Sequence, residues 1–377
     1  MSLANGLLFV LFHLVGGLFN ARIVDRGNRK RVLAIGIAAW SISTAATGLA
    51  HDFATLSVAR IGVGIGEATV FPAAMSLIPD LFRPLARGKA VAVFQSSGFI
   101  GIVGGTILAG VLAASHGWRA MFFICGLAGV ALAAVLVLSV REPRREFAAA
   151  RDAASLSWVG DLAAGSRRVL AIPGFAALAI AFGISGMMTA VLGTWGPAFL
   201  QRSHDVPLAQ VGLAIGPAVG IGGIAGTLLS GVLADRLARR HGTDVAMLRV
   251  PLVALPLAVP FMAGFVLFSG LVATMASAAV MNFLISCSFA PCINYAVTRA
   301  DPGDRGLAAT IMLAASGLIG AALGPFIVGA SSDALAAHFG NESLRYALAT
   351  MIATPLVSVA FLAAAMRRAA PVDGLPA

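Results

Sequence analysis

One apolar stretch, Leu56–Pro79, carries two charged residues that could do chemistry, Arg60 and Glu67. The stretch is long enough for a membrane-spanning helix, because about 20 helical residues cross the hydrocarbon core. A charge inside a membrane is costly, so it usually faces a cavity or a partner and marks a transport pathway. The two residues are seven positions apart, which places them on one helix face, about two turns from each other.

This spacing suggests a role for the pair. A glutamate between an apolar environment and a nearby arginine could take up and release a proton near neutral pH. We therefore predict that Glu67 carries a coupling proton and that Arg60 is its partner or an anion anchor. The alternative is a structural ion pair that only orients the helix.

The composition is that of a protein with several membrane spans. Hydrophobic residues make up 59% of the 377 residues, charged residues only 11%, and the mean hydropathy is +0.93, whereas soluble domains have about 25% charged residues. The net charge of +10 indicates basic loops on one side of a membrane rather than nucleic-acid binding. The three cysteines fall in apolar stretches without a CxxC pair or a histidine cluster, so we expect no metal site, no cofactor and no disulfide.

Hydropathy divides the chain into eleven predicted membrane helices. They are Ser2–Ala21, Val32–Ala50, Leu56–Pro79, Ala90–Ser115, Met121–Val140, Pro173–Leu200, Leu208–Leu233, Val250–Ser269, Leu271–Val297, Leu307–Ser331 and Leu344–Met366. The longest break, Arg141–Ile172, is charged and rich in Ala and Ser. We therefore expect an N-terminal bundle of five spans over residues 1–140, a linker over 141–172 and a C-terminal bundle of six spans over 173–377.

Lysine and arginine are concentrated on one predicted side of the membrane. Of the 26 basic residues, all but Arg60, Arg119, Arg202 and Arg345 fall in loops on the side of the linker and the C-terminus. The positive-inside rule then predicts that the linker and the C-terminus are cytoplasmic. An odd number of spans would place the N-terminus outside.

Two segments, Ala21–Val32 and Gly231–Gly242, repeat one pattern at the cytoplasmic end of a predicted helix. Each places an acidic–basic pair before a basic turn. The pairs are Asp25-Arg26 and Asp235-Arg236. If the segments correspond, the chain consists of two similar bundles related by an axis along the membrane normal, which is one architecture of secondary transporters.

The first of these segments resembles the signature loop of the major facilitator superfamily, Gly-x-Leu-Ala-Asp-Arg-x-Gly-Arg-Arg, with Ala21 in place of the first glycine. Arg60 followed by Gly64 and Gly66 is similar to a second signature of that superfamily. Segments that resemble its spinster-like branch are Gly62–Ala68, Asp80–Arg83, Arg141–Pro143, Trp195–Pro197 and Gly324–Asp333. The resemblance implies an all-α polytopic membrane protein with the major facilitator fold, in which two pseudo-symmetric bundles hold twelve helices.

The resemblance also implies a gate at the repeated pairs. Asp25 would dock on a helix N-terminus across the bundle interface, while Arg26 or Arg29 would pair with Asp80. The residues with this implied gating role are Asp25, Arg26, Arg29, Asp80, Asp235 and Arg236. Anions do stabilise helix N-termini. The alternative is ordinary positive-inside charge, which explains the arginines but not the repeated aspartate.

Only eleven of the expected twelve helices are present, because no span corresponds to the first helix of the superfamily. An upstream start codon would restore that helix. A chain that lacks it would be a truncated, transport-inactive paralogue acting as a partner or sensor, which is the alternative to a transporter.

Five polar residues inside the spans could line a substrate pathway, and each could equally be a core residue: His13, Gln95, Trp195, Asn282 and Asn294. The sequence favours a secondary transporter that couples to protons by symport and moves a small organic anion or an amphipathic, lipid-like solute. An enzyme is disfavoured because the chain has no HExxH motif and no paired Ser and His within its membrane helices. A channel is disfavoured because no ring of like residues appears. We expect the lipid bilayer, a small-molecule substrate and the coupling proton as partners, a monomer, and a location in a bacterial inner membrane.

Overall fold

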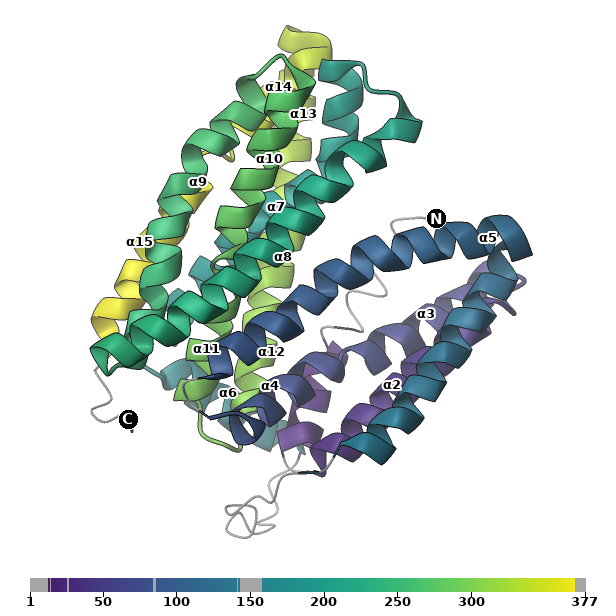
Figure 1. Ribbon diagram of the computed structural model, residues 1–377, viewed down its shortest axis with the longest axis vertical. Coiled ribbons are helices and arrows are strands. Elements are labelled where there is room, and N and C mark those ends of the chain that lie inside the picture. Colours follow the sequence, from purple (N-terminus) through teal and green to yellow (C-terminus); the bar gives the residue numbers. More distant parts are fainter. Residues whose placement is uncertain are drawn as a thin grey trace. The chain divides into compact units, whose positions relative to one another are not determined.

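The computed structural model describes residue 13 and residues 15–25, 27–83, 86–140, 142 and 158–369. All regular structure in these ranges is helical and none of it is strand, which confirms the all-α fold (Figure 1). The chain forms two compact units, and each is described by itself. The first contains Met1–Arg83, Gly104–Ile172 and Val297–Ile311, and the second contains Pro84–Val103, Pro173–Ala296 and Met312–Ala377. The division at residues 140 and 172 stays a prediction.

The first unit is built from a helical segment, residues 15–25, and from helices taken from three parts of the chain. They are α2 (Arg29–Thr47), α3 (Phe53–Glu67), α4 (Val70–Leu81), the C-terminal part of α5 (Arg87–Ser139), α6 (Trp158–Ala171) and the start of α12 (Arg305–Ala315). Val24, Leu33, Ile37, Ala73 and Leu77 form a buried apolar cluster there. Because α6 falls inside the predicted linker, this segment is partly helical.

The predicted span Leu56–Pro79 consists of two helices. α3 ends at Glu67 and α4 begins at Val70, and the two residues between them form a turn. Pro72 explains the break, because it has no amide hydrogen to donate to the carbonyl of Ala68 one turn earlier. Glu67 therefore lies at the C-terminal end of α3.

Helix α5 contains a sharp bend at Gly117. The backbone there has φ 81° and ψ 157°, a conformation that glycine adopts without strain and that other residues rarely adopt. The bend falls between the two predicted spans Ala90–Ser115 and Met121–Val140.

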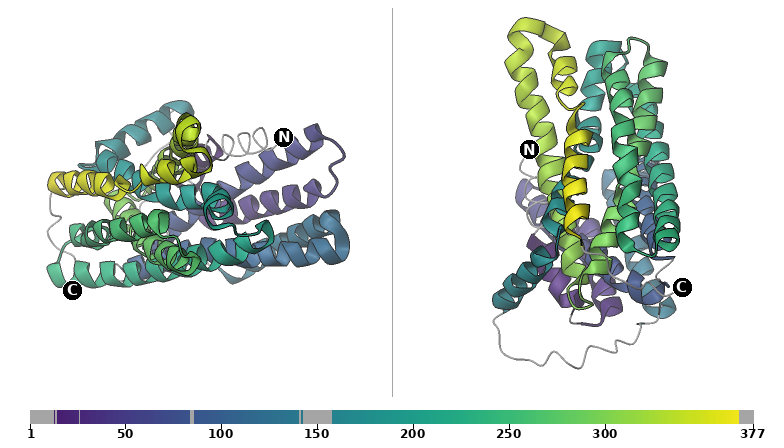
Figure 2. Two further views of the ribbon diagram at one scale, coloured as in Figure 1. Left: turned by 90° about the horizontal axis from the view of Figure 1, so that it is seen from above. Right: turned by 90° about the vertical axis from the view of Figure 1, so that its left-hand side faces the viewer.

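The second unit holds most of the C-terminal half of the chain. Its helices are α7 (Phe175–His204), α8 (Leu208–His241), η2 (Asp244–Leu248), α9 (Arg249–Leu267), α10 (Leu271–Ser286), α11 (Phe289–Arg299), the π-helical η3 (Ser316–Leu323), α13 (Gly324–Phe339), η4 (Gly340–Glu342), α14 (Ser343–Ala349) and α15 (Thr354–Arg368). Figure 2 shows α7 to α10 running alongside one another within this unit. Leu192, Phe199, Met262, Phe265 and Met281 are fully buried between them.

Seven helical stretches of the described chain are long and apolar enough to cross a membrane. They are Phe53–Leu81, Ser115–Ser139, Phe175–His204, Gln210–His241, Asp244–Leu267, Leu271–Arg299 and Arg305–Arg368. The last has 64 residues, which is enough for more than one crossing. The predicted span Ser2–Ala21 lies largely outside the described residues, and the number of eleven spans stays a prediction.

Candidate functional site

Asp25 ends the helical segment 15–25 and binds the N-terminus of another helix. Its two carboxylate oxygens accept hydrogen bonds from the backbone amides of Gly306 (3.0 Å) and Leu307 (3.1 Å), in the first turn of α12. The carboxylate is buried, with 3% of Asp25 exposed. A Cβ on Gly306 would lie 2.9 Å from one of these oxygens, so glycine is what lets the carboxylate approach. The family resemblance implied a contact of Asp25 with a helix N-terminus, and its role as a gate between the bundles stays a prediction.

Arg29 and Asp80 join the same region through an ion pair. The family resemblance implied such a pair for Arg26 or Arg29, and its gating role stays a prediction. Arg29 also donates to Glu142 Oε1 at 2.8 Å and to the carbonyl of Ser76 at 3.0 Å, although only 1% of the residue is exposed. Arg305, the first residue of α12, binds the other oxygen of Asp80 at 2.8 Å. Asp80 thus holds α2 and α12 together through two arginines.

Asp235 repeats the arrangement in the second unit. It lies on α8, is 3% exposed, and accepts hydrogen bonds from the amides of Gly88 and Lys89, both at 2.9 Å. These amides belong to the first turn of α5. A Cβ on Gly88 would lie 2.4 Å from the carboxylate, and one on Gly231 would lie 2.5 Å from the carbonyl of Gly88. The two helices therefore touch through glycines.

The helices that receive the two aspartates begin alike, and the sequence analysis did not use this. α12 begins with Arg305-Gly306 and α5 with Arg87-Gly88. An arginine–glycine pair that recurs in both halves was thus a readable signal for the partners of the repeated aspartates. Of the other predicted gate residues, Arg236 is exposed, and Arg26 lies outside the described residues.

Glu67 and Arg60 are both half-buried, but their described contacts are to different partners. Arg60 places its guanidinium 5.6 Å from the centre of the Phe122 ring. Glu67 interacts electrostatically with His13. No ion pair joins Arg60 to Glu67 within the described part of the chain.

Packing explains why His13 meets Glu67. Residues 13, 16 and 20 lie on one face of their helix. Asn20 on that face donates from Nδ2 to the carbonyl of Ile65 at 2.9 Å, and a Cβ on Gly16 would lie 3.4 Å from the Cα of Ile65. That face therefore packs against the end of α3, where Glu67 lies.

Comparison with known proteins agrees with this arrangement. The model of the Major Facilitator Superfamily matches residues 1–325. The chain belongs to the major facilitator superfamily. An MFS-type efflux pump of Mycolicibacterium smegmatis is 32% identical over 356 residues, which are 94% of this chain and 80% of the pump. A probable L-galactonate transporter of Escherichia coli is 26% identical over 66% of this chain and 57% of its own length.

A solved structure supports the spinster-like branch of the superfamily. It is the crystal structure of a bacterial homolog to the human lysosomal transporter Spinster in an inward-facing and occupied conformation. It is 25% identical, has a TM-score of 0.64, and is matched over 97% of this chain and 89% of that chain. These relatives indicate a transporter rather than an enzyme. The described residues contain no group of three or more His, Cys, Asp or Glu that could hold a metal ion.

The polar residues predicted to line the pathway of this major facilitator protein take different positions. Asn282 is fully buried, donates to the carbonyl of Val219 at 2.7 Å and accepts from Thr189 at 3.0 Å. Trp195 donates to the carbonyl of Pro325 at 2.9 Å, and Asn294 is 2% exposed. Gln95 and His13 are half-buried. A role in lining the pathway stays a prediction for all five, while the bonded amide of Asn282 also suits a structural role.

The sequence analysis missed a second group of charged residues in the first unit. The buried Arg22 forms ion pairs with Asp161 and Asp304, and the half-exposed Arg168 pairs with the buried carboxylate of Asp304. Burial alone would raise the pKa of Asp304, but the hydrogen bonds and charges of Arg168 and Arg22 outweigh it and hold this pKa below its usual range. The one sequence signal for this group was the presence of charged residues in the linker, and composition does not reveal which residues pair with which.

Proposed function

We propose that this major facilitator protein is a proton-coupled secondary transporter that moves a small organic anion or an amphipathic, lipid-like solute by alternating access. The observation that carries the proposal is the pair of buried aspartates, Asp25 and Asp235, which each cap the first turn of a helix. Two equivalent contacts in two sequence repeats are what a transporter needs if its repeats rock against each other.

The chemistry of the contact suits a gate. A carboxylate against the N-terminal amides of a helix is stabilised by the helix dipole and by two charge-assisted hydrogen bonds. Such a contact is strong when it is dry, and it is replaced by water when the surfaces separate. It therefore favours one of two discrete arrangements without making the other inaccessible.

Glu67 is the proposed carrier of the coupling proton. It is half-buried at the end of α3 and interacts electrostatically with His13. Arg60 on the same helix is the proposed anchor for an anionic group of the substrate, because its described contact, the face of Phe122, leaves its hydrogen-bond donors available.

The names of relatives support the substrate class. One relative is named as a probable transporter of L-galactonate, which is an organic anion, and another as an efflux pump. Symport rather than antiport is proposed from the sequence, because it lacks the proline-interrupted motif typical of antiporters in this superfamily.

The orientation is also a proposal. Basic loops support a cytoplasmic C-terminus in a bacterial inner membrane, and the resemblance to the superfamily supports a monomer. A reporter enzyme that is active only in the cytoplasm, fused after Ala377, would test the orientation. Activity of a periplasmic reporter at the same position would contradict it.

Flux into proteoliposomes tests the proton coupling. Purified protein is reconstituted, a pH gradient is imposed, and uptake of labelled L-galactonate and of labelled lysophosphatidylcholine is followed. We expect gradient-driven accumulation of one probe by the wild type and its loss in Glu67→Gln, whose exchange of probe in the absence of a gradient should persist. Glu342→Gln, at an exposed turn, is the matched control.

Two results would contradict the proposal. Full gradient-driven accumulation by Glu67→Gln would remove Glu67 from proton coupling. Absence of flux for every organic anion and amphipathic probe, with correctly folded protein, would overturn the substrate class.

A further inference from the structure

Helix α6 lies in the segment that the sequence assigns to a linker, yet it carries one buried face. Asp161, Gly165, Arg168 and Val169 follow at helical spacing, which places them on one side of α6. Asp161 is 9% exposed and Val169 is 1% exposed, whereas Arg167 is exposed. A free tether would not bury a charged side in this way, so α6 is docked.

Arg22 is the residue on which α6 docks. It lies in the helical segment 15–25, three residues before Asp25, and only 2% of it is exposed. Its guanidinium donates to the backbone carbonyl of Asp161 at 3.1 Å and lies 3.3 Å from the carboxylate of that residue. It also donates to Asp304 Oδ1 at 2.6 Å and to the carbonyl of Gly303 at 3.0 Å.

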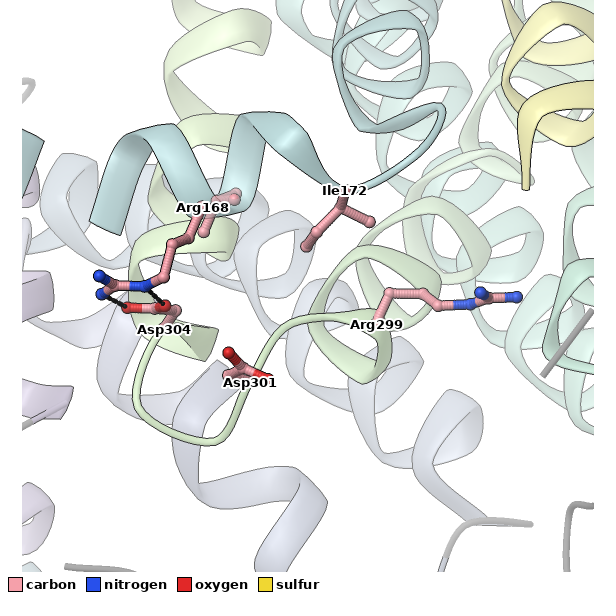
Figure 3. A pocket seen from close by; sticks show the side chains of 6 residues that line it. Arg168, Ile172, Arg299, Asp301 and Asp304 are labelled. Atoms are coloured by element: carbon pink, nitrogen blue, oxygen red, sulfur yellow. Dashed lines mark hydrogen bonds and ion pairs between the residues drawn. The ribbon is translucent and has the colours of Figure 1, made fainter. Parts of the chain in front are cut away.

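Arg168 closes the arrangement from α6. Its Nε and Nη2 donate to the two oxygens of Asp304, at 2.8 and 3.0 Å (Figure 3). Together with Arg22, two arginines therefore hold this carboxylate. Beside the contact is a small hollow of about 60 Å³ that is also lined by Asp301. Figure 3 shows Asp301 beside Asp304 on the same turn, while the side chain of Arg299 points away. The local charges are therefore arranged around Arg168.

Gly165 makes the close approach possible. A Cβ at this position would lie 1.4 Å from Nη2 of Arg22, so any other residue would displace a guanidinium that donates three hydrogen bonds and forms an ion pair with Asp161. The glycine sits in the interior of α6, where it costs helix stability. Its presence there is explained by the packing of Arg22 against the backbone of α6.

The turn that α6 contacts, at Asp304, leads directly into the first turn of α12, which binds Asp25. The carbonyl of Gly303 accepts a hydrogen bond from Arg22, and the carboxylate of Asp304 accepts one from Arg168. Two and three residues after Asp304, the amides of Gly306 and Leu307 donate to Asp25. Arg22 and Asp25, which both bind this turn, lie in the same helical segment, residues 15–25. Separation of α12 from Asp25 would therefore also pull Asp304 away from Arg22.

We infer that α6 is a latch of the gate: the contacts of Asp161, Gly165 and Arg168 with Arg22 and Asp304 hold the turn before α12 in the position at which Asp25 caps it. This inference rests on the proposed gating role of Asp25. Arg22, Asp161 and Arg168 are positioning residues, since they act on the gate through the turn. The predicted linker thus takes part in the choice between access states.

Hydrogen exchange measured by mass spectrometry on the full chain in lipid nanodiscs tests the latch without any substrate. Exchange is followed in two regions. They are residues 158–171 of α6 and residues 303–309, which contain the amides that bind Asp25. We expect Arg168→Gln to speed exchange in both regions by about tenfold, because charge-assisted hydrogen bonds that protect them are lost. Arg167→Gln removes an exposed charge from the neighbouring position and should change neither. Arg168→Lys should restore part of the protection.

Gly165→Ala is the second variant, and it keeps every charge. It raises the helix propensity of α6, so faster exchange at 303–309 would come from displacement of the groups that the added methyl meets, the guanidinium of Arg22 at 1.4 Å and Cδ2 of Leu307 at 3.0 Å. Unchanged exchange in α10 shows that a variant is folded. If Arg168→Gln does not fold, exchange at 303–309 in Gly165→Ala and Arg168→Lys decides whether the latch stands.

The outcomes separate the latch from the gate. Asp25→Asn should speed exchange at 303–309, and if it does not, the gate proposal fails. If Asp25→Asn has this effect while Arg168→Gln and Gly165→Ala leave 303–309 unchanged, the gate stands and the latch is overturned. Faster exchange in α6 alone also overturns the latch, because α6 would then be docked without acting on the turn.

Discussion

Two buried carboxylates, those of Asp25 and Asp235, show how much one side chain can organise in this protein. Each accepts two backbone amides at the start of a helix, where the first amides have no partner within the helix. The carboxylate therefore both satisfies the helix end and gains from its dipole.

Asp25→Asn and Asp235→Asn test these contacts. An amide keeps the shape of the side chain but has no charge and only one acceptor oxygen, so each variant should lower the free energy of unfolding by about 1–3 kcal/mol. Thermal unfolding of the detergent-solubilised protein measures the shift. Asp333→Asn, at an exposed position of α13, should unfold like the wild type. Equal stability of all four proteins would contradict the importance of the helix contacts.

At the scale of the element, the helices that receive the aspartates depend on glycine in their first turn. Gly88 in α5 and Gly306 in α12 occupy equivalent places, and a Cβ would come within 2.4 Å and 2.9 Å of a carboxylate oxygen. The approach is closer at Gly88, where the backbone of α8 is also in contact through Gly231. An added methyl group at Gly88 would meet both the Asp235 side chain and the backbone of α8, whereas one at Gly306 would meet the side chain of Asp25.

Alanine at these glycines should therefore act in a graded way. Gly88→Ala should lower the free energy of unfolding by about 1–3 kcal/mol through overpacking, and Gly306→Ala by less, because its clash is milder. Gly98→Ala on the same helix α5 is the control, since no described heavy atom lies within 4 Å of its added Cβ. Urea or thermal unfolding of the three variants would give the ranking. A loss for Gly98→Ala equal to that for Gly88→Ala would contradict this account.

At the scale of the whole molecule, the buried ion pairs join segments that are far apart in the chain. Arg22 and Asp304 are 282 residues apart, and Arg168 reaches Asp304 over 136 residues. Their formation therefore requires that much of the chain is already folded. Such pairs make the stability of the first unit depend on pH as well as on packing.

The pH dependence has a definite sign. The pKa of Asp304 is lowered from its ordinary value of 3.8, since the hydrogen bonds and charges of Arg168 and Arg22 outweigh the effect of burial. A lowered pKa in the folded state contributes stability that is fully present above the unfolded value and is lost as pH falls through the folded one. Asp161 and Asp301 also face these arginines, so the comparison needs a variant of Asp304 itself.

Thermal unfolding of the wild type and of Asp304→Asn, from pH 7 down to about pH 2, measures this contribution. At pH 7 we expect the variant to be less stable by about 3–5 kcal/mol, because two arginines lose a buried partner. The difference should shrink below pH 3.8. A difference that stays constant down to the lowest pH would contradict the assigned ionisation, and Asp333→Asn should differ little from the wild type throughout.

Much of the candidate site could be predicted from local patterns. The repeated Asp25-Arg26 and Asp235-Arg236 pairs indicated the two carboxylates, and the family resemblance indicated that Asp25 meets a helix N-terminus. The partners of Glu67 and Arg60 could not be predicted in the same way. Helical periodicity places these two on one face, but it does not say which helix packs on that face. Arg60 lies over the Phe122 ring, and Glu67 interacts electrostatically with His13.

The sequence by itself determined the class of protein: runs of about 20 apolar residues can only be helices in a membrane, because their backbone groups need partners within the segment. It also determined that two halves carry the same acidic motif. Only the tertiary structure decided what α6 does and where Arg22, Arg168 and Asp304 find their partners. The physical reason is that an ion pair between residues more than a hundred positions apart leaves no periodic trace along the chain, and is set by which helices pack together.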